Sequence, residues 1–166
     1  DIAMDRDLFY EAFPHINMMK KNGRAPSLYD EAMARLFLKT GWTTEARRHV
    51  AALKRSPFPS AGISLEAGIC RSEGDPYHES LALGLLMELD RYDRDLMLSR
   101  AGALEKTGDL DSADLFLHQA AALFPNDTGI KLRLAAVIQN TRGSGPALPY
   151  LAAALKLGVE PAECAV

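Results

Sequence analysis

Residues 95–125 read DLMLSRAGALEKTGDLDSADLFLHQAAALFP, and this stretch decides the fold. Its first half carries apolar residues at the spacing of an α-helix, namely Leu98, Ala101 and Leu104. Gly108 follows, and glycine is the residue that most readily adopts the positive φ at which many helices end. The first half therefore predicts a short helix that stops at Gly108.

The second half of the same stretch predicts a second helix that folds back on the first. Small and large apolar residues lie on one stripe, at Ala113, Leu117, Ala120 and Ala121. Proline at 125 ends the stripe because it cannot continue a helix. Asp109 and Asp111 are candidate N-caps, since short acidic side chains accept hydrogen bonds from the first amides of a helix.

The pattern of this hairpin recurs along the chain. Alanine returns after steps of 33, 34 and 34 residues, at Ala34, Ala67, Ala101 and Ala135. Three residues after these alanines stand Phe37, Cys70, Leu104 and Ile138. Seven residues after the first three alanines stand Gly41, Gly74 and Gly108. A helical hairpin of about 34 residues that repeats in phase is typical of a stacked array.

These positions resemble the tetratricopeptide repeat (TPR) family. The resemblance is carried by residues that stand where the family keeps small, large, turn and proline residues: Ala101, Leu104, Gly108, Ala113, Leu117, Ala120 and Pro125. It covers roughly residues 27–161 and implies an all-α, right-handed solenoid of antiparallel helical hairpins. We expect about four repeats, near 27–59, 60–93, 94–127 and 128–161. The second departs from the pattern, with Glu79 at a small-residue position and Arg91 in place of proline.

Residues 1–26 precede this array as an N-terminal helix and linker, which we interpret as a partial repeat or a cap. The helix is predicted to close at Pro14, with a turn or linker within 15–26 and Ser27 capping the next helix. Trp42 is interpreted as an aromatic lid on the first hairpin. The helix over 77–90 is apolar nearly all round, so we expect it to be the most buried one. Residues 162–166 are predicted to form a tail.

Composition excludes several classes of protein. The 166-residue chain is 48% hydrophobic, with a net charge of −3, which disfavours nucleic-acid binding because phosphates require a basic surface. No apolar run is long enough to span a membrane. Cys70 stands at a repeat position that is expected to face the core, and Cys164 lies in the tail, so a disulfide is not expected. A cytoplasmic location is favoured, although two cysteines do not fix the compartment.

Candidate chemistry is sparse. Three histidines, His49, His78 and His118, lie near one another in phase on successive second helices, but such separated side chains do not predict a metal site. The sequence contains no phosphate-binding loop after a strand and no set of nucleophile, base and orienting group. We therefore expect no catalytic, cofactor-binding or metal-binding residues, and no enzymatic activity.

The TPR resemblance implies that the first helix of each repeat lines an inner groove in which protein segments bind. By phase, the groove residues are Glu31, Arg35, Leu38, Ser64, Gly68, Arg71, Leu98, Gly102, Glu105, Leu132, Ala136 and Gln139. We expect Arg35 and Arg71 to contact anionic groups. Gly68 and Gly102 have two explanations, a small groove floor or close packing between helices, because glycine costs about 1 kcal/mol relative to alanine within a helix.

Three functions remain open at this point. The leading hypothesis is a non-catalytic scaffold that binds a protein or peptide partner in this groove. A second is the recognition or regulatory arm of a larger enzyme, such as a glycosyl- or sulfotransferase, because the sequence begins at Asp1 with a partial repeat. A third is a self-assembling envelope or secretion adaptor, in which the N-terminal helix or the C-terminal flank would form the interface of a homo-oligomer.

Overall fold

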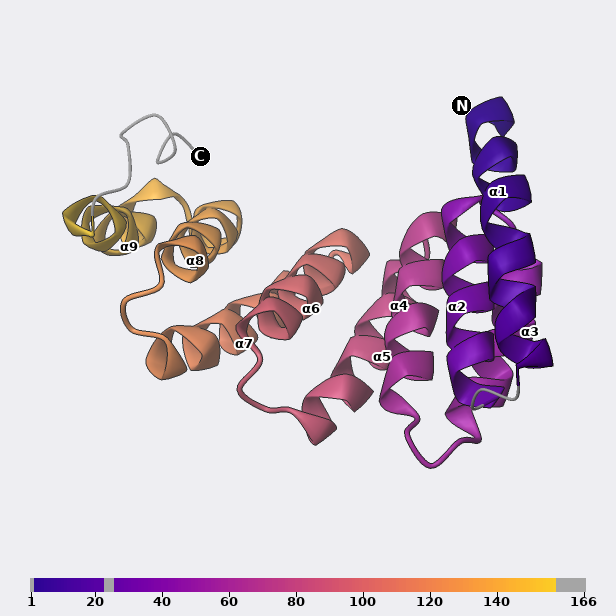
Figure 1. Ribbon diagram of the computed structural model, residues 1–166. Helices are drawn as coiled ribbons and strands as arrows, with labels where there is room; N and C mark the ends of the chain where they lie inside the picture. Colours follow the sequence, from indigo (N-terminus) through magenta and orange to yellow (C-terminus); the bar gives the residue numbers. More distant parts are fainter. Residues whose placement is uncertain (1, 23–25, 158–166) are drawn as a thin grey trace. The chain divides into compact units, whose positions relative to one another are not determined.

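The computed structural model describes residues 2–22 and 26–157, and the side chains from residue 9 onward. Every regular element in this part of the chain is an α-helix (Figure 1). The helices are α1 (Ile2–Lys21), α2 (Pro26–Lys39), α3 (Thr43–Lys54), α4 (Ser60–Glu73), α5 (Pro76–Leu89), α6 (Arg94–Thr107), α7 (Leu110–Leu123), α8 (Thr128–Arg142) and α9 (Ser144–Lys156). The predicted all-α helical repeat fold is confirmed. The predicted tail with Cys164, and part of the predicted linker, lie outside the described residues.

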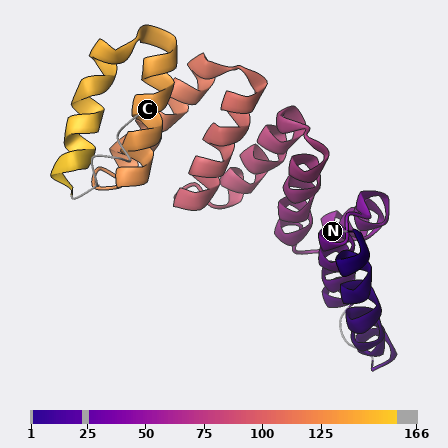
Figure 2. The same cartoon turned by 90° about the horizontal axis from the view of Figure 1, so that it is seen from above.

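The helices form two compact units, Asp1–Leu89 and Asp90–Val166. In the first unit α2 packs against α1, α3 and α4, and α4 packs against α5. In the second unit α6, α7, α8 and α9 pack consecutively, and Figure 2 shows α8 and α9 side by side. The helices thus pair as expected for hairpins, while the repeat limits near residues 27, 60, 94 and 128 stay predictions.

Buried alanines set the distance between helices in both units. The repeating alanines of the first helices are at most 3% exposed, at Ala34, Ala67, Ala101 and Ala135. On the second helices, alanines at the corresponding contact are fully buried at Ala46, Ala113 and Ala147. Because a methyl group is the only side chain at these points, the helices of a hairpin approach closely and larger residues fill the space on either side.

The predicted turn glycines have the backbone conformation that the turn requires. Their φ angles are +78° at Gly41, +71° at Gly74 and +80° at Gly108. Residues with a Cβ rarely adopt this conformation, whereas glycine adopts it at little steric cost. The amide of Gly108 donates to the carbonyl of Glu105 at 3.0 Å, which satisfies one of the last carbonyls of α6.

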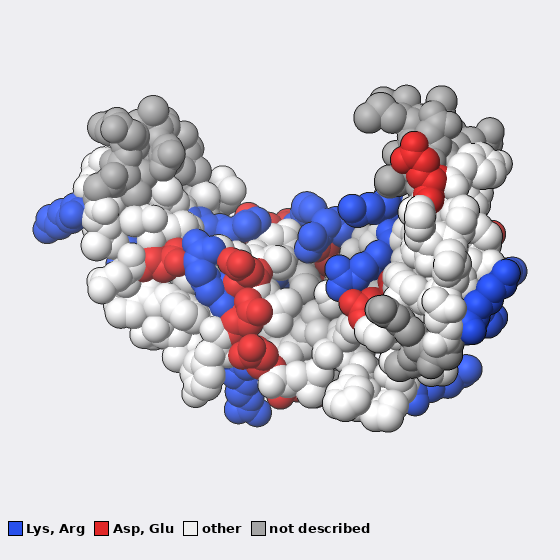
Figure 3. Space-filling view, viewed as in Figure 1, with Lys and Arg blue, Asp and Glu red and all other residues white. Residues whose placement is uncertain are grey.

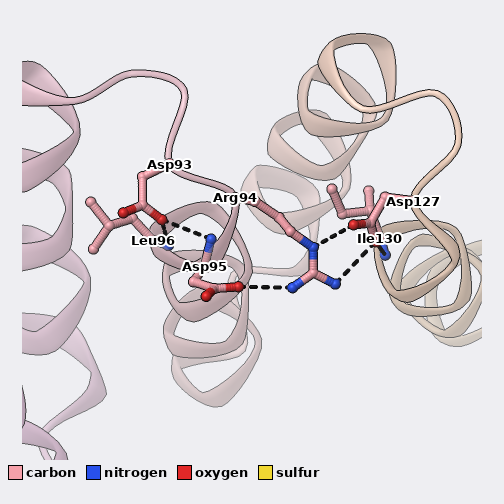
Figure 4. Close-up of polar contacts among 6 residues, drawn as sticks. All are labelled: Asp93, Arg94, Asp95, Leu96, Asp127 and Ile130. Carbon is pink, nitrogen blue, oxygen red and sulfur yellow. Dashed lines mark hydrogen bonds and ion pairs between the residues drawn. The ribbon is translucent and has the colours of Figure 1, made fainter.

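Aspartates cap three helices of the second unit, α6, α7 and α8, and Figure 4 shows the caps of α6 and α8. Asp93 accepts hydrogen bonds from the amides of Asp95 and Leu96, and Asp127 accepts one from Ile130 at 2.8 Å. The guanidinium of Arg94, at the start of α6, also binds the Asp127 carboxylate at the start of α8. This contact lowers the pKa of Asp127. The N-terminal ends of α6 and α8 are therefore joined by one arginine.

Only one of the two caps predicted for α7 is present. The side chain of Asp109 accepts a hydrogen bond from the Ser112 amide at 3.1 Å and caps the helix. Asp111 lies inside the first turn, where its negative charge favours the helix N-terminus without capping it.

The prediction that the N-terminal helix closes at Pro14 was wrong, since α1 continues to Lys21. Proline removes one helical hydrogen bond, but packing beyond it maintains the helix. Ile16 packs on the core of the first unit, and the ammonium of Lys20 lies 5.2 Å from the centre of the Tyr29 ring. Ser27 is likewise not a cap, because α2 begins one residue earlier at Pro26.

Trp42 closes the turn between α2 and α3. The centroid of its ring lies 4.7 Å from that of Phe9 and 5.8 Å from that of Phe37. It is 36% exposed, so one part of the ring packs on the hairpin and the rest meets solvent. This arrangement agrees with the interpretation of Trp42 as an aromatic lid.

The expectation that residues 77–90 form the most buried helix was wrong. Leu81, Leu85 and Leu89 of α5 are 51%, 47% and 62% exposed. The opposite side of the helix, with Leu83 and Leu86, is buried. Within its unit α5 packs chiefly on α4, so an all-round apolar sequence is buried on one side only.

We expect leucine in place of Ala101 or Ala135 to destabilise the protein by about 1–3 kcal/mol, because neither site has room for a larger side chain. The measurement is urea denaturation followed by circular dichroism. Ala122→Leu, at an exposed site on the neighbouring helix α7, is the matched control and should change stability little. Wild-type stability of Ala101→Leu and Ala135→Leu would show that the helices do not meet at these residues.

The Asp127 carboxylate makes a pH-dependent contribution to stability. Its pKa in the folded state is lowered, so it stabilises the fold above its unfolded pKa of about 3.9, and this stabilisation is lost as the pH falls through the folded value. At pH 7 we expect Asp127→Ala to cost about 2 kcal/mol and Asp127→Asn, which retains a capping oxygen, about 1 kcal/mol. Urea denaturation at pH 7 and pH 3 should show both differences shrink at the lower pH. Differences that persist at pH 3 would exclude a role of the charge.

Candidate functional site

The residues predicted for the groove lie on the first helices of the hairpins, α2 and α4 in one unit and α6 and α8 in the other. We refer to each set as the first-helix face of its unit. In the first unit, Arg35 is 64% exposed, and its guanidinium lies 2.6 Å from the Glu31 carboxylate one turn earlier on α2. Ser64 on α4 is exposed. Leu38 is half-buried against the core and reaches across to α4.

Arg71, predicted to contact anionic groups of a ligand, already binds an acidic side chain. Its Nε donates to the Glu79 carboxylate of α5 at 2.6 Å. Glu79 is only 2% exposed and occupies the position at which the other hairpins place a buried alanine. Because a buried carboxylate is costly unless it is paired, Arg71 compensates for this departure from the repeat. Its role within the hairpin is therefore structural.

The first-helix face of the second unit is more apolar and more closely packed. Leu98 is half-buried and packs on the core of the unit, and Gly102 is buried. Leu132, Ala136 and Gln139, all on α8, are half-buried. The guanidinium of Arg133 reaches from α8 to the Glu105 carboxylate of α6 at 2.7 Å. Leu98, Leu132 and Ala136 thus remain partly open to solvent, and of these three Leu98 packs on the core cluster while Leu132 and Ala136 do not.

A side chain from a neighbouring helix lies against each glycine in these helices. A Cβ at Gly102 would lie 2.5 Å from the terminal nitrogen of Arg133. A Cβ at Gly68 would lie 3.0 Å from a methyl carbon of Leu38. Side chains from the preceding or following repeat therefore occupy the space that the glycines leave. Of the two explanations, the structure favours packing over a small, open floor.

Charge on these faces is largely neutralised in place. Each arginine and glutamate predicted for the groove has an oppositely charged partner within its own unit: Glu31 with Arg35, Arg71 with Glu79, and Glu105 with Arg133. Figure 3 shows blue and red side chains adjoining one another on the visible face. Sequence reasoning missed Glu79 and Arg133 as partners. The sequence contains an indication of the role of Glu79, because Glu79 stands at a repeat position where the other hairpins have a small residue. It contains no such indication for Arg133.

The residues considered for metal or redox chemistry are separately engaged. His49 binds Asp30 at 2.8 Å, His78 binds Asp75 at 2.6 Å, and His118 binds the Tyr150 hydroxyl at 2.9 Å. Within residues 2–22 and 26–157 there is no group of three or more potential metal ligands. Cys70 is buried, which raises the pKa of its thiol. Among the described helices, none is long and apolar enough to cross a membrane.

The assignment of Arg71 to Glu79 can be tested by removing each arginine of the first-helix face. Arg71→Met leaves the buried Glu79 carboxylate unpaired and should cost about 1–3 kcal/mol of stability in urea denaturation. Arg35→Met removes an exposed pair and should change stability by no more than about 0.5 kcal/mol.

The double variant Arg71→Met with Glu79→Ala provides the decisive comparison. It removes the buried charge together with its partner and places alanine where the other hairpins have it, so stability should return to at least the wild-type value. A double variant as unstable as Arg71→Met alone would contradict the compensation of Glu79 by Arg71.

Comparison with known proteins supports the fold. No family model matches the sequence, and no curated protein matches it. Solved structures are similar along nearly the whole chain. A structure of MamA labelled AMB-1 shares 14% identity, with a TM-score of 0.69, over 98% of this chain and 97% of MamA. YrrB, described as a TPR protein with an unusual peptide-binding site, shares 13% identity, with a TM-score of 0.74, over 98% of this chain and 84% of YrrB.

A third similar structure is TTC0263, a thermophilic TPR protein from Thermus thermophilus. It shares 20% identity, with a TM-score of 0.58, over 98% of this chain and 92% of that protein. At these identities the likeness establishes the fold and assigns no partner or binding residue. The chain is therefore a helical-repeat protein with the fold of the tetratricopeptide repeat proteins.

Proposed function

We propose that this protein is a non-catalytic scaffold that binds a segment of another protein on its first-helix faces. The observation that carries the proposal is the pair of side chains on α8, Leu132 and Ala136, which the core of the second unit leaves half-buried. Neither belongs to the buried cluster that joins α6, α7, α8 and α9. Partly exposed apolar side chains on a rigid helix provide contact area that a partner can cover.

The charge pairs of these faces determine what kind of segment would bind. Because Arg35 and Arg71 each have an acidic partner at 2.6 Å, a ligand carboxylate would have to displace that partner. We therefore favour recognition through apolar contacts and hydrogen bonds over capture of a free anionic group. YrrB, with a similar fold, is described as having a peptide-binding site, which supports this class of function here.

A second candidate is self-association through α9. Leu148, Leu155 and Leu157 are 60%, 42% and 42% exposed at the C-terminal end of the described chain. Leu148 and Leu155 lie on α9 and Leu157 follows it, and exposed apolar residues grouped in this way favour contact with another protein surface. Sedimentation at several protein concentrations tests this candidate, and a monomer at every concentration would exclude it.

Glutamate at Leu132 should abolish binding to the second first-helix face. The side chain is half-buried and outside the main core cluster, so the substitution places a charge in the contact area while the fold persists. The measurement is quantitative mass spectrometry of proteins retained by the immobilised wild-type chain from a cell extract, compared with the variant. We expect at least a tenfold loss of the specifically retained species, about 1.4 kcal/mol.

Leu123→Glu, at a 46% exposed leucine of α7, is the matched control. It introduces the same charge away from the first-helix face and should retain the wild-type set of proteins. Circular dichroism establishes that both variants are folded. Identical retention by Leu132→Glu and the wild type would reject this face as the binding site.

A further inference from the structure

A groove with different residues crosses the first unit over α4, between α3 and α5. It consists of two adjoining hollows of about 280 Å³ and 360 Å³, which share Arg47 and Glu66 on their linings. Buried Val50 and Ala82 form part of its floor. Its lining residues lie on α3, α4 and α5, except Arg55 just after α3 and Asp75 in the turn before α5, and none belongs to the first-helix face. We refer to it as the α3–α5 groove.

The α5 side of this groove carries apolar side chains beside the paired Asp75 and His78. Leu81 and Leu85 line it and are 51% and 47% exposed, although they are large hydrophobic side chains. Tyr77 and Leu89 extend the same spacing of four residues along α5 and are 61% and 62% exposed. Residues four apart lie on one side of a helix, so these side chains form a continuous stripe. Such a stripe matches the apolar face of a second helix laid along it.

The α3 side of the groove is basic. One acidic and three basic side chains line its hollow, namely Glu66, Arg47, Lys54 and Arg55. Lys54 lies 2.5 Å from Glu66, and Arg47 binds Glu73, yet both cations stay 38% and 44% exposed. Arg55 is exposed and has no acidic partner among the described residues. The whole groove lining carries Arg47, Lys54 and Arg55 against Glu66 and Asp75, so the positive charge that is left without a partner is that of Arg55.

We propose that the α3–α5 groove binds an acidic amphipathic helix of a partner protein. Leucine-like side chains of that helix pack on Leu81 and Leu85, and its acidic residues face Arg47, Lys54 and Arg55. Charge complementarity selects this occupant, because an acidic helix would pair with Arg55, the lining cation that has no acidic partner among the described residues, and a basic helix would be repelled by it. The inference goes beyond binding on the first-helix faces, since it concerns another surface and a partner of defined charge.

The test uses two synthetic peptides and the full chain. Each peptide has about 18 residues, long enough to form a helix, with leucines along one face. One carries glutamates beside the leucines and the other carries lysines at the same positions. Fluorescence anisotropy should show that the wild-type chain binds the acidic peptide at least about tenfold more tightly than the basic one, and that added salt weakens this binding.

Variants then locate the binding. Leu81→Ser and Arg55→Glu each alter an exposed side chain, so the fold is retained, and each should weaken binding of the acidic peptide about tenfold or more. Leu115→Ser, at a 64% exposed leucine of α7, is the matched control and should bind as the wild type does. Circular dichroism verifies that every variant is folded.

The remaining outcomes separate this inference from the proposed function. Loss of binding in Leu132→Glu with unchanged binding in Leu81→Ser would place the peptide on the first-helix face and overturn the inference. The inference is also overturned if the wild type does not bind the acidic peptide or binds both peptides equally. It is overturned as well if a short DNA duplex displaces the peptide while Leu81→Ser binds the peptide as the wild type does. Retained binding in Leu132→Glu with loss in Leu81→Ser supports it.

Discussion

The close approach of two helices at a buried alanine is the constraint on which this structure depends. At Ala101, Ala113, Ala135 and Ala147 no side-chain surface is left exposed, so the helices of the second unit are spaced by a methyl group. That spacing brings the larger residues around it, such as Leu117 and Ile138, into a continuous core. The turn must then be short and sharply reversed, which the positive φ of Gly108 permits. Small residues at the contact and glycine at the turn are two parts of one geometric requirement.

This requirement explains which parts of the fold are predictable from the sequence. Alanines and glycines recur at a fixed period because every hairpin meets the same steric condition, and their positions predict the helices and turns of both units. The course of α1 past Pro14 and the exposure of α5 do not follow from any repeated condition. Whether Ile16 holds a helix together beyond a proline, or whether anything covers Leu85, depends on neighbours distant in sequence. Periodicity shows which side of a helix is apolar, but it does not show what packs against that side.

The candidate site illustrates the same difference at the level of single side chains. Phase along the first helices correctly assigns Arg35, Arg71 and Glu105 to those helices, but long side chains reach partners on other helices. Arg71 extends to Glu79 on the next helix, and Arg133 extends from α8 across Gly102 to Glu105 on α6. The end of the arginine thirty-one residues later thus lies in the space beside Gly102. A comparison of equivalent positions in the repeats considers each residue by itself. Such pairs can therefore be identified only from the structure, in which the helices lie next to one another.

These pairs bear on how a scaffold of this kind recognises a partner. A charge that is already paired inside a hairpin contributes to stability, and a ligand must replace that partner before it gains from the charge. A ligand that contacts residues which the repeat does not require has no such partner to displace. Leu132 and Ala136 on α8, and Leu81, Leu85 and Arg55 around the α3–α5 groove, are of this kind, because neither the buried alanine contact nor the glycine turn uses them. Every repeat must keep its buried alanine and its turn, so recognition of a partner depends on the side chains that are free to differ between repeats. In this chain those side chains lie on two surfaces, the first-helix face of the second unit and the α3–α5 groove.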